Sequence, residues 1–378
     1  MTTALHGITW NHTRGFVPLV ATAQRFEELH PKINITWEKR SLQSFGDDSL
    51  HALAERFDLL VIDHPSVGEA ADFLCPLDSY LCPDFLTTLG FSSAGASQES
   101  YVWQGRHWAL AIDAAAPVSS WRPDLLDQMR LTVPETWSEV LELAKAGLVA
   151  VPLAPIDALM AFYMFCCAAG EAPFSQPGCV AAEQVQIDAL GCLADLAQHC
   201  GEEYLSRNPI ATYEAMTSSD HLAYCPFAYG YSNYARPGYA THVLRFGPLV
   251  AMPDGPRLRS TLGGAGLAVS SRSRHAAVAA EYAGFVAAAE CQRGLYFTSG
   301  GQPGHRAAWE DPAVNAACGN FFMNTLSVLD QAYLRPRFPG YLPFQGDAAQ
   351  LVHRFLRAGA NPLQVCRELN QLYTHVKQ

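Results

Sequence analysis

The chain has few charged residues, only 16% of its 378 positions, and no block rich in lysine or arginine. Its formal net charge is -11, so the phosphate backbone of a nucleic acid would be repelled at long range. Zinc-finger spacing is also missing. We therefore expect no nucleic-acid partner.

Motifs of the common enzyme classes are missing as well. The sequence contains no G-x-S-x-G, P-loop, H-E-x-x-H or C-x-x-C, and no G-x-G-x-x-G after a strand. Without a nucleophile motif or a ligand cluster, the sequence predicts a non-catalytic protein that has neither a cofactor nor a metal site.

A secretory signal is not recognisable in the first residues, which show no basic start, no apolar run and no cleavage site. The eleven cysteines are odd in number and irregularly spaced, which fits a reducing compartment better than a disulfide framework. Two alternatives stay open. The protein is cytoplasmic as its sequence stands, or periplasmic if a signal was removed and Met1 added.

One long stretch is almost free of charge: between residues 146 and 170 only Asp157 is charged. Pro152 and Pro155 interrupt it. We interpret it as a short buried strand over 149–153 followed by a buried helix over 156–169, too short to cross about 30 Å of hydrocarbon. No membrane insertion is expected.

Strand and helix patterns alternate along the chain, and the length favours two domains. The first patterns form a β-α-β-α-β series, which predicts a parallel sheet flanked by helices, with strands at 5–10, 33–37 and 58–63 and helices at 15–30 and 45–57. The first helix has its apolar residues roughly on one side, namely Val17, Val20, Ala21, Ala23, Phe26 and Leu29.

Further signals lie downstream. Residues 101–110 indicate a hairpin about a glycine turn, and Thr136 with Glu139 forms a capping box at a helix start. Later strands are predicted at 222–227, 243–248 and 262–270, a helix at 275–290, and a mostly helical last 120 residues.

In this order and spacing, the segments resemble the extracellular solute-binding proteins of ABC transporters, the family of the maltose-type sugar binders. The similar segments are Ile8–Trp10 followed by Phe26–Ile35, then Phe57–Val61, Phe73–Asp78, Trp103–Leu110, Pro134–Glu139 and Gly263–Val269. The sequence departs from the family at Ala111, where a proline is usual, and at Ser120–Trp121, where an aromatic-Asn pair is usual. The family's signal peptide and lipoprotein cysteine are not recognisable.

The resemblance implies an α/β, two-lobed periplasmic-binding-protein-like type II fold with three crossings between the lobes and a hinge. Lobe 1 would take residues 1–112 and 262–304, and lobe 2 residues 113–261 and 305–378. A small polar ligand, carbohydrate-like or a small organic acid, would bind in the cleft between the lobes, which would close over it. The implied partners are that ligand and an ABC transporter permease, and we expect a monomer.

Candidate ligand residues follow the first strand, where a doubly wound sheet presents its ligand-facing loop. Trp10 offers an indole face to a sugar ring, and Asn11, His12 and Arg14 supply hydrogen-bond donors. The alternative is a tryptophan packed under the loop, with polar surface neighbours.

Three further candidates lie at the same predicted edge and the first crossing. Asp63 and His64 end the third strand and can bind hydroxyl groups, or Asp63 can cap the helix that begins near Pro65. Asp113 binds ligand hydroxyls or holds the hinge.

The remaining candidates are Trp121, the pair Tyr229 and Tyr231, Gly264 and Arg306. Phenols both stack and hydrogen-bond. Gly264 would let the backbone approach a ligand, although a strained crossing needs glycine equally. Arg306 would pair with an anionic ligand or remain solvated.

Two other functions stay open. Thiaminase-like relatives with this architecture use a cysteine, and Cys225, which we expect at a strand end, is the candidate nucleophile. A cytoplasmic ligand sensor or accessory protein would explain the unrecognised signal.

Overall fold

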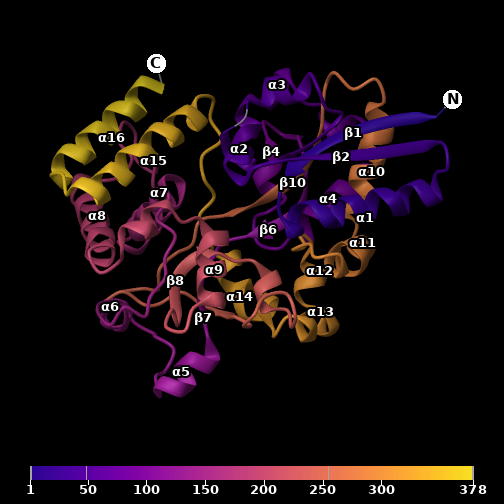
Figure 1. The fold of residues 1–378 in the computed structure, drawn as a ribbon. Helices are drawn as coiled ribbons and strands as arrows, with labels where there is room; N and C mark the ends of the chain where they lie inside the picture. Colours follow the sequence, from indigo (N-terminus) through magenta and orange to yellow (C-terminus); the bar gives the residue numbers. More distant parts are fainter. Residues whose placement is uncertain (1, 48, 254, 377–378) are drawn as a thin grey trace. The chain divides into compact units, whose positions relative to one another are not determined.

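The computed structural model of the protein describes residues 2–47, 49–253 and 255–376 (Figure 1). The chain divides into two compact units. Unit 1 comprises residues 1–115, 262–316 and 337–339, and unit 2 comprises residues 116–261, 317–336 and 340–378.

Unit 1 is built on a five-stranded sheet in the order β2-β1-β3-β10-β6. Its strands are β1 (Thr3–Trp10), β2 (Ile33–Arg40), β3 (Leu59–Ile62), β6 (Leu110–Ala115) and β10 (Gly263–Val269), with a separate hairpin of β4 (Val102–Trp103) and β5 (Arg106–His107). Strand β1 pairs in parallel with β2 and β3 as predicted, but β10 runs antiparallel to both its neighbours. The parallel pairing predicted for the first three strands is confirmed, and the later strand β10 adds an antiparallel member to the sheet.

The helices of unit 1 lie between these strands or follow β10. They are α1 (Thr13–Leu29), α2 (Leu42–Asp47), α3 (Leu50–Ala54), α4 (Pro83–Phe91), α10 (Ala276–Ala287), α11 (Ala289–Cys291) and α12 (Arg306–Trp309), with α13 (Pro312–Ala317) at its boundary. Short 3-10 turns are η1 (His64–Asp72), η2 (Leu77–Ser79) and η3 (Glu99–Tyr101), and η6 (Gln292–Tyr296) is a π-helix.

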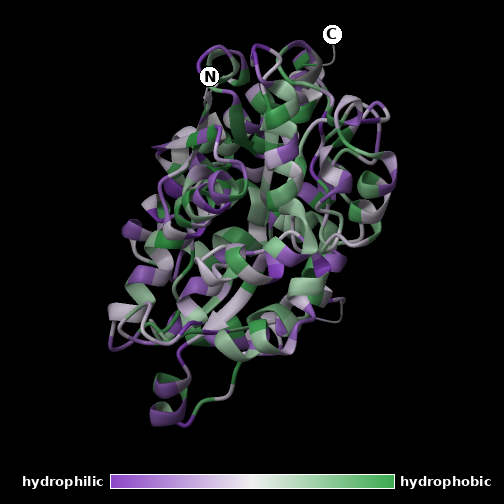
Figure 2. Cartoon of the chain, turned by 90° about the vertical axis from the view of Figure 1, so that its right-hand side faces the viewer, coloured by the Kyte–Doolittle hydropathy of each residue, from purple (hydrophilic) through white to green (hydrophobic). Residues whose placement is uncertain are grey.

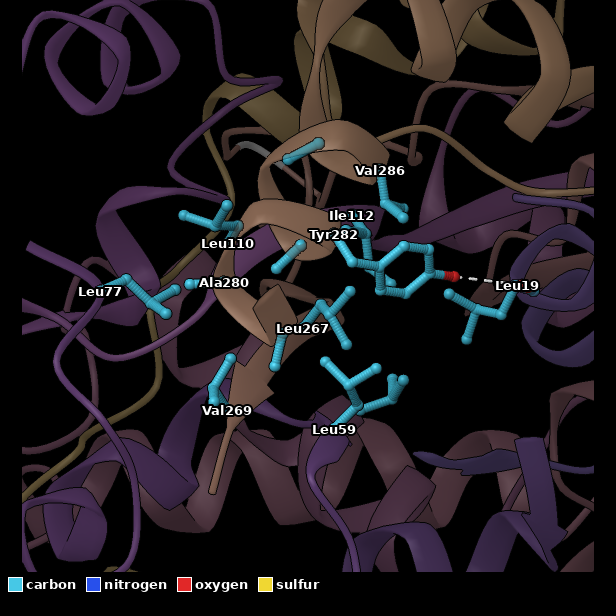
Figure 3. Packing of buried hydrophobic residues seen from close by; sticks show 14 of the residues in the cluster. Leu19, Leu59, Leu77, Leu110, Ile112, Leu267, Val269, Ala280, Tyr282 and Val286 are labelled. Carbon is cyan, nitrogen blue, oxygen red and sulfur yellow. Dashed lines mark hydrogen bonds between the residues drawn. The ribbon is translucent and has the colours of Figure 1, made fainter. Parts of the chain in front are cut away.

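The sheet of unit 1 is buried on both faces, because successive side chains of a strand point to opposite sides. In β3, Leu59 and Val61 join a cluster with α1 and α10, whereas Leu60 and Ile62 join a second cluster on the other face. Figure 3 shows the first cluster, in which the Tyr282 hydroxyl donates to the carbonyl of Leu19 at 3.1 Å. Two apolar layers thus hold the strands.

The predicted apolar side of the first helix is confirmed at Ala23 and Phe26, which are buried, and is wrong at Val17, Val20 and Leu29. Val17 and Val20 are each 42% exposed, whereas the buried side includes Pro18, Leu19 and Thr22. Thr22 is buried because its hydroxyl lies 2.9 Å from that of Tyr282, a partner 260 residues away.

The predicted helix over 45–57 is instead two short helices, α2 and α3. Ser49, directly before α3, has an extended backbone. The hairpin prediction is confirmed for β4 and β5, whose two turn residues, Gln104 and Gly105, both have positive φ angles. Such a turn matches the twist of the paired strands.

Unit 2 combines a three-stranded sheet with several helices. The sheet order is β8-β7-β9, formed by β7 (Pro117–Trp121), β8 (Tyr224–Tyr229) and β9 (Arg245–Gly247). The helices are α5 (Pro123–Met129), α6 (Trp137–Lys145), α7 (Pro155–Ala168), α8 (Glu183–Ala197), α9 (Pro209–Ser218), α14 (Phe321–Asp330), α15 (Tyr341–Ala358) and α16 (Pro362–Val376), with 3-10 turns η4 (Glu202–Ser206) and η5 (Ser232–Ala235).

Local signals in unit 2 are confirmed. Thr136 accepts from the backbone of Glu139, and the Glu139 carboxylate accepts in return, which completes the capping box of α6. Helix α7 has 14 residues, most of them buried, as predicted. Within residues 2–47, 49–253 and 255–376, no helix is both long and apolar enough to span a membrane. Most helices carry both polar and apolar residues (Figure 2).

The boundaries of the units differ from the predicted ones at three places. Residues 113–115 belong to unit 1 because they continue strand β6. Residues 305–316 also belong there, where the backbone N–H of Arg306 donates to the carbonyl of Ser92 at 2.7 Å. Residues 337–339 do too, because the Arg337 guanidinium donates to the carbonyls of Glu99, Ser100 and Val102.

Candidate functional site

Several predicted residues of unit 1 meet at one edge of its sheet. Strands β1 and β3 are parallel, and β6 shares their direction because both β3 and β6 are antiparallel to β10. The carboxyl ends of β1, β3 and β6 and the amino end of β10 therefore lie at the same edge. In open α/β sheets, this is the edge at which ligands bind.

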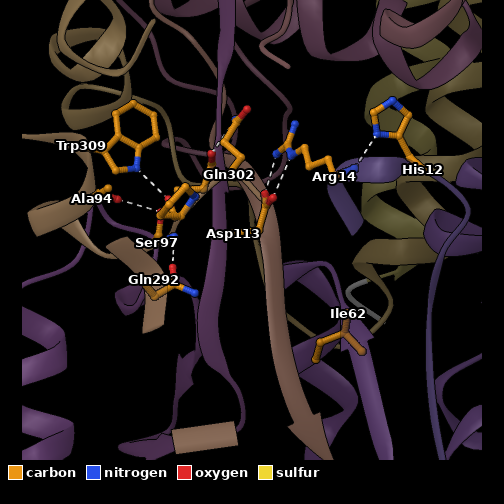
Figure 4. Close-up of polar contacts among 12 residues, drawn as sticks. His12, Arg14, Ile62, Ala94, Ser97, Asp113, Gln292, Gln302 and Trp309 are labelled. Carbon is orange, nitrogen blue, oxygen red and sulfur yellow. Dashed lines mark hydrogen bonds and ion pairs between the residues drawn. The ribbon is translucent and has the colours of Figure 1, made fainter. Parts of the chain in front are cut away.

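Arg14 and Asp113 form a buried ion pair at this edge (Figure 4). Arg14 Nε donates to Asp113 Oδ2 at 2.7 Å and Nη2 donates to Oδ1 at 2.5 Å. Both side chains are nearly inaccessible, at 4% and 1% exposure. Burial raises the pKa of the Asp113 carboxyl, and the guanidinium of Arg14 opposes this rise.

The two residues were predicted separately as ligand contacts, and the structure instead pairs them with each other. Because both Asp113 oxygens accept from Arg14, we assign the pair to holding the start of α1 against β6. The alternative that Asp113 holds the hinge stays a prediction.

His12 is the N-cap of α1. Its Nδ1 accepts from the backbone N–H of Arg14 at 3.0 Å, so in the neutral ring the proton is on Nε2. Burial, reinforced by the charge of Arg14, lowers the pKa of His12 to about 4. The half-buried imidazole is thus neutral at pH 7, with an Nε2–H donor.

Trp10 and Asn11 differ in accessibility. Trp10 is 4% exposed, and its ring packs against Phe45 and so close to Gly15 that an added Cβ there would lie 2.4 Å from the indole. The stacking platform predicted for Trp10 is therefore contradicted, because the indole lies beneath the loop. Asn11 is exposed, with its backbone N–H donated to the carbonyl of Arg40.

Asp63 and His64 also differ in accessibility. The half-buried Asp63 accepts through Oδ1 from the backbone N–H of the adjacent His64, at the start of η1. A capping side chain accepts from the second or third residue of a helix, so both alternatives for Asp63 stay predictions. His64 is fully buried beside Asp63 and lies edge-on to Tyr101. The predicted contact of His64 with ligand hydroxyl groups stays a prediction.

The conformation of Gly264 and the contacts of the Arg306 side chain both depend on other residues of unit 1. Gly264 has a φ of 111°, and a Cβ there would lie 2.3 Å from the carbonyl oxygen of Asp113, so glycine is required for strand pairing. The guanidinium of Arg306 contacts the carbonyl of Ser93 and the carboxylate of Glu310. The Arg306 side chain is 30% exposed and therefore stays partly solvated, and an anionic ligand would compete with Glu310.

The loop at residues 302–304, which the sequence indicated only as a glycine-containing turn, extends this edge. Gln302 donates to the carbonyl of Ala114, Trp309 Nε1 donates to the carbonyl of Pro303, and Gly304 donates to Gln292 Oε1 (Figure 4). These contacts hold residues 302–304 beside β6. No local pattern marks them, since they join residues up to 188 positions apart.

In unit 2, the predicted aromatic residues have different surroundings. Tyr229, at the end of β8, is half-buried, and its hydroxyl lies 3.1 Å from Thr261 Oγ1. Tyr231 is only 5% exposed and packs against Tyr213 and Tyr234. Tyr231 is therefore a core residue, which contradicts its prediction as an accessible contact.

Trp121 is the last residue of β7 and is half-buried. Its ring packs near Gly247 and a small apolar cluster that includes Leu125 and Leu126. Trp121 stays a candidate contact only through its exposed part.

Cys225 lies within β8 rather than at its end, as its pairing with Ser120 requires. The thiol is fully buried, and burial raises its pKa to about 12. A reactive thiolate needs exposure and a low pKa. This environment opposes the cysteine-dependent enzyme.

Iodoacetamide at neutral pH should therefore leave Cys225 unmodified in the folded protein while it alkylates Cys82, which is exposed. Peptide mass spectrometry after a short exposure measures both residues in one sample. Rapid labelling of Cys225 under conditions that keep the protein folded would contradict its assignment as an inert core residue.

One polar residue that we did not place in a site is Asp157, in the first turn of α7. It is 7% exposed, and its Oδ2 is buried with no hydrogen-bond partner among the described residues. A signal did exist in the sequence, because Asp157 is the single charge in an otherwise uncharged stretch.

Each unit, taken by itself, has accessible groups that can donate or accept hydrogen bonds. In unit 1 they are the amide of Asn11, the neutral imidazole of His12 and the carboxylate of Asp63, and in unit 2 the phenol of Tyr229. Donors and acceptors without a reactive nucleophile suit binding of hydroxyl groups.

No family model matches the chain, and no curated protein matches it in sequence. Its fold, in contrast, matches many solved structures. It superposes on maltose-bound MalE3 of T. maritima with a TM-score of 0.84 and 19% identity, covering 99% of this chain and 100% of that one. A solute-binding protein of an ABC transporter from Agrobacterium radiobacter, in complex with ribitol, gives 0.83 and 17%, covering 99% and 98%.

A third similar structure is UgpB from Mycobacterium tuberculosis in complex with glycerophosphocholine, at a TM-score of 0.77 and 16% identity over 100% of this chain and 99% of that one. At identities this low, the high TM-scores establish similarity of fold and nothing more. The chain thus has the α/β periplasmic-binding-protein-like fold of the maltose-type solute-binding proteins, and the resemblance predicted from its sequence is confirmed at that level.

Proposed function

We propose that the protein binds a small, polyhydroxylated ligand without transforming it, as the solute-binding component of an ABC-type uptake system. The observation that carries this proposal is the match of fold over the whole chain to proteins solved with maltose and with ribitol. Because fold does not fix function, the chain's own residues must support the proposal too.

The polar groups at the sheet edge of unit 1 provide that support. The side chain of Asn11 is exposed, and His12 is held as a neutral donor by its capping bond to Arg14. Asp63 supplies an acceptor beside them. Neutral donors with one carboxylate recognise hydroxyl groups, and they carry no cluster of positive charge for a strongly anionic ligand.

Maltose, ribitol, tagatose and glycerophosphocholine form a first panel, since proteins of this fold were solved with each of them. At least one should raise the melting temperature of the purified protein in a concentration-dependent manner. At one hundred times its Kd, a ligand adds about 2.7 kcal/mol to the free energy of unfolding. Differential scanning fluorimetry measures the shift.

Mass spectrometry of the recovered ligand is the matched control. We expect the ligand unchanged after prolonged incubation. Chemical turnover would contradict a binding role, and the absence of any shift across the panel would contradict the ligand class.

The cellular location of the protein and its partner distinguish a function in transport from a function in ligand sensing. The proposed partner is the permease of an ABC transporter, and the alternative is a cytoplasmic sensor on the same fold. All eleven cysteines are free thiols, which supports a reducing compartment. Fractionating cells that express the full-length gene product separates the two. The ligand position and the hinge closure that the resemblance implies stay predictions.

A further inference from the structure

Helix α1 begins at a histidine cap that forms in one protonation state only. His12 has an extended backbone, and its Nδ1 accepts from the backbone N–H of Arg14 at 3.0 Å. The usual residues at an N-cap are Asn, Asp, Ser and Thr, whose side-chain oxygens accept hydrogen bonds. A histidine accepts there only while Nδ1 carries no proton, because both ring nitrogens of the protonated imidazole are donors.

The first turn of α1 connects this cap to a buried ion pair. The backbone N–H groups of Gly15 and Phe16 both donate to the carbonyl of His12. Arg14, in the same turn, places its guanidinium on the carboxylate of Asp113 in β6. Figure 4 shows the contacts that lead from His12 through Arg14 to Asp113. A loss of the cap therefore acts directly on the residue that carries the guanidinium.

The charges around this turn disfavour a protonated His12. Among the side chains that the structure describes, the charged and titratable groups on the surrounding elements are Arg14 on α1, Lys39 and Arg40 at the end of β2, Asp63 and His64 after β3, Asp113 on β6 and Tyr296 on η6. Asp113 is paired with Arg14. Asp63 Oδ1 lies 3.3 Å from Nδ1 of His64. An imidazolium would thus lie beside the charge of Arg14 and the positive end of the helix dipole.

Acid therefore favours opening of the turn. Burial, reinforced by the charge of Arg14, lowers the pKa of His12 from 6.5 to about 4. In an opened turn the imidazole is hydrated and recovers its ordinary pKa, so the open state binds more protons than the closed state between these two values. The stabilising effect of the cap is fully present above pH 6.5 and is lost as the pH falls towards 4.

We propose that His12 is a pH-sensitive cap that positions Arg14: the neutral imidazole holds the first turn of α1 and the pair of Arg14 and Asp113, and protonation releases both. The sheet edge that also carries Asn11 and Asp63 is then assembled at neutral pH and loosened in acid. This role needs no ligand, so it goes beyond the proposed function and does not depend on it.

Amide hydrogen exchange of the full-length protein, followed by NMR at pH 7 and pH 5, tests the inference. The backbone amide of Arg14 reports the cap directly. After correction for the intrinsic effect of pH on exchange, its protection factor in the wild type should fall about twentyfold, as the two pKa values of His12 require. The Nε–H of Arg14, which donates to Asp113, should lose protection in parallel.

Three variants complete the design. His12→Asn keeps an acceptor at the N-cap that does not titrate, so the protection of the Arg14 amide should change by less than about twofold between the two pH values. His12→Ala removes the cap and should lower this protection about fivefold at pH 7, with no further fall at pH 5. His51→Asn is the matched control, because His51 is an exposed histidine of α3, and it should keep the wild-type pH profile. Circular dichroism verifies that each variant is folded.

Two results would overturn the inference. The first is a wild-type protection factor of the Arg14 amide that is equal at both pH values. The second is a fall in His12→Asn as large as that of the wild type, because a different group would then be titrating. The experiment contains no ligand, so neither result bears on ligand binding. Failure of the whole ligand panel would, in turn, leave the pH-sensitive cap intact.

Discussion

Replacing Asp157 with asparagine should stabilise the protein, increasingly so as the pH rises from 5 to 8. The pKa of Asp157 in the folded protein is raised from 3.8 to about 8, so the folded state binds more protons than the unfolded state between these values. Stability therefore falls with rising pH over this range, by about 1.4 kcal/mol per unit. Asparagine has no such dependence.

Urea denaturation of both proteins at pH 5, 6.5 and 8 measures the effect. The advantage of Asp157→Asn over the wild type should grow by about 4 kcal/mol between the two extremes. Asp84→Asn, the same substitution at an exposed position, should give no such trend. An advantage independent of pH would show that Asp157 is already ionised at pH 5.

Breaking the buried pair of Arg14 and Asp113 should lower the free energy of unfolding by an amount comparable to the gain expected for Asp157→Asn. Arg14→Ala leaves the carboxylate of Asp113 buried at 1% exposure without its bidentate partner. Removal of one partner of a buried ion pair costs about 3–5 kcal/mol. Urea denaturation of the whole protein measures the loss of stability. Hydrogen exchange of the native protein then shows whether the loss is located in α1 and β6 of unit 1.

A double variant distinguishes the interaction between the two residues from the cost of burying either charge without its partner. Arg14→Met with Asp113→Leu should cost much less than the sum of the two single substitutions, because neither charge then remains buried alone. The surface pair of Arg25 and Glu28 on the same helix is the control, and Glu28→Ala should cost less than about 1 kcal/mol. Additive single effects in the double variant would contradict a direct coupling.

Local signals in the sequence predicted local structure well. The capping box of Thr136 and Glu139 forms because its donors and acceptors are three residues apart, so neighbours in the chain decide it. The β4–β5 hairpin likewise depends on its own two turn residues. The alternating pattern indicated an α/β sheet, and the order of segments indicated the fold.

The candidate site was predicted less well, because accessibility depends on partners far away in the sequence. Arg14 and Asp113 are 99 residues apart in the sequence, so their pairing is visible only in the folded sheet. In the sequence each was therefore predicted as a separate ligand contact. His64 and Tyr231 are buried for the same reason. The buried side of α1 was predicted only in part, because Tyr282, from another part of the chain, gives the buried Thr22 a partner.

The amino-acid sequence by itself indicated most of the helices and strands, which α/β fold they build, and that the chain carries no common catalytic motif. These properties follow from backbone conformation, caps and the spacing of apolar residues over a few positions. Tertiary structure alone decided which polar groups neutralise one another and which, like Asp157, are buried unpaired. Desolvation and ion pairing depend on the distance between atoms in space, which the order of residues does not state.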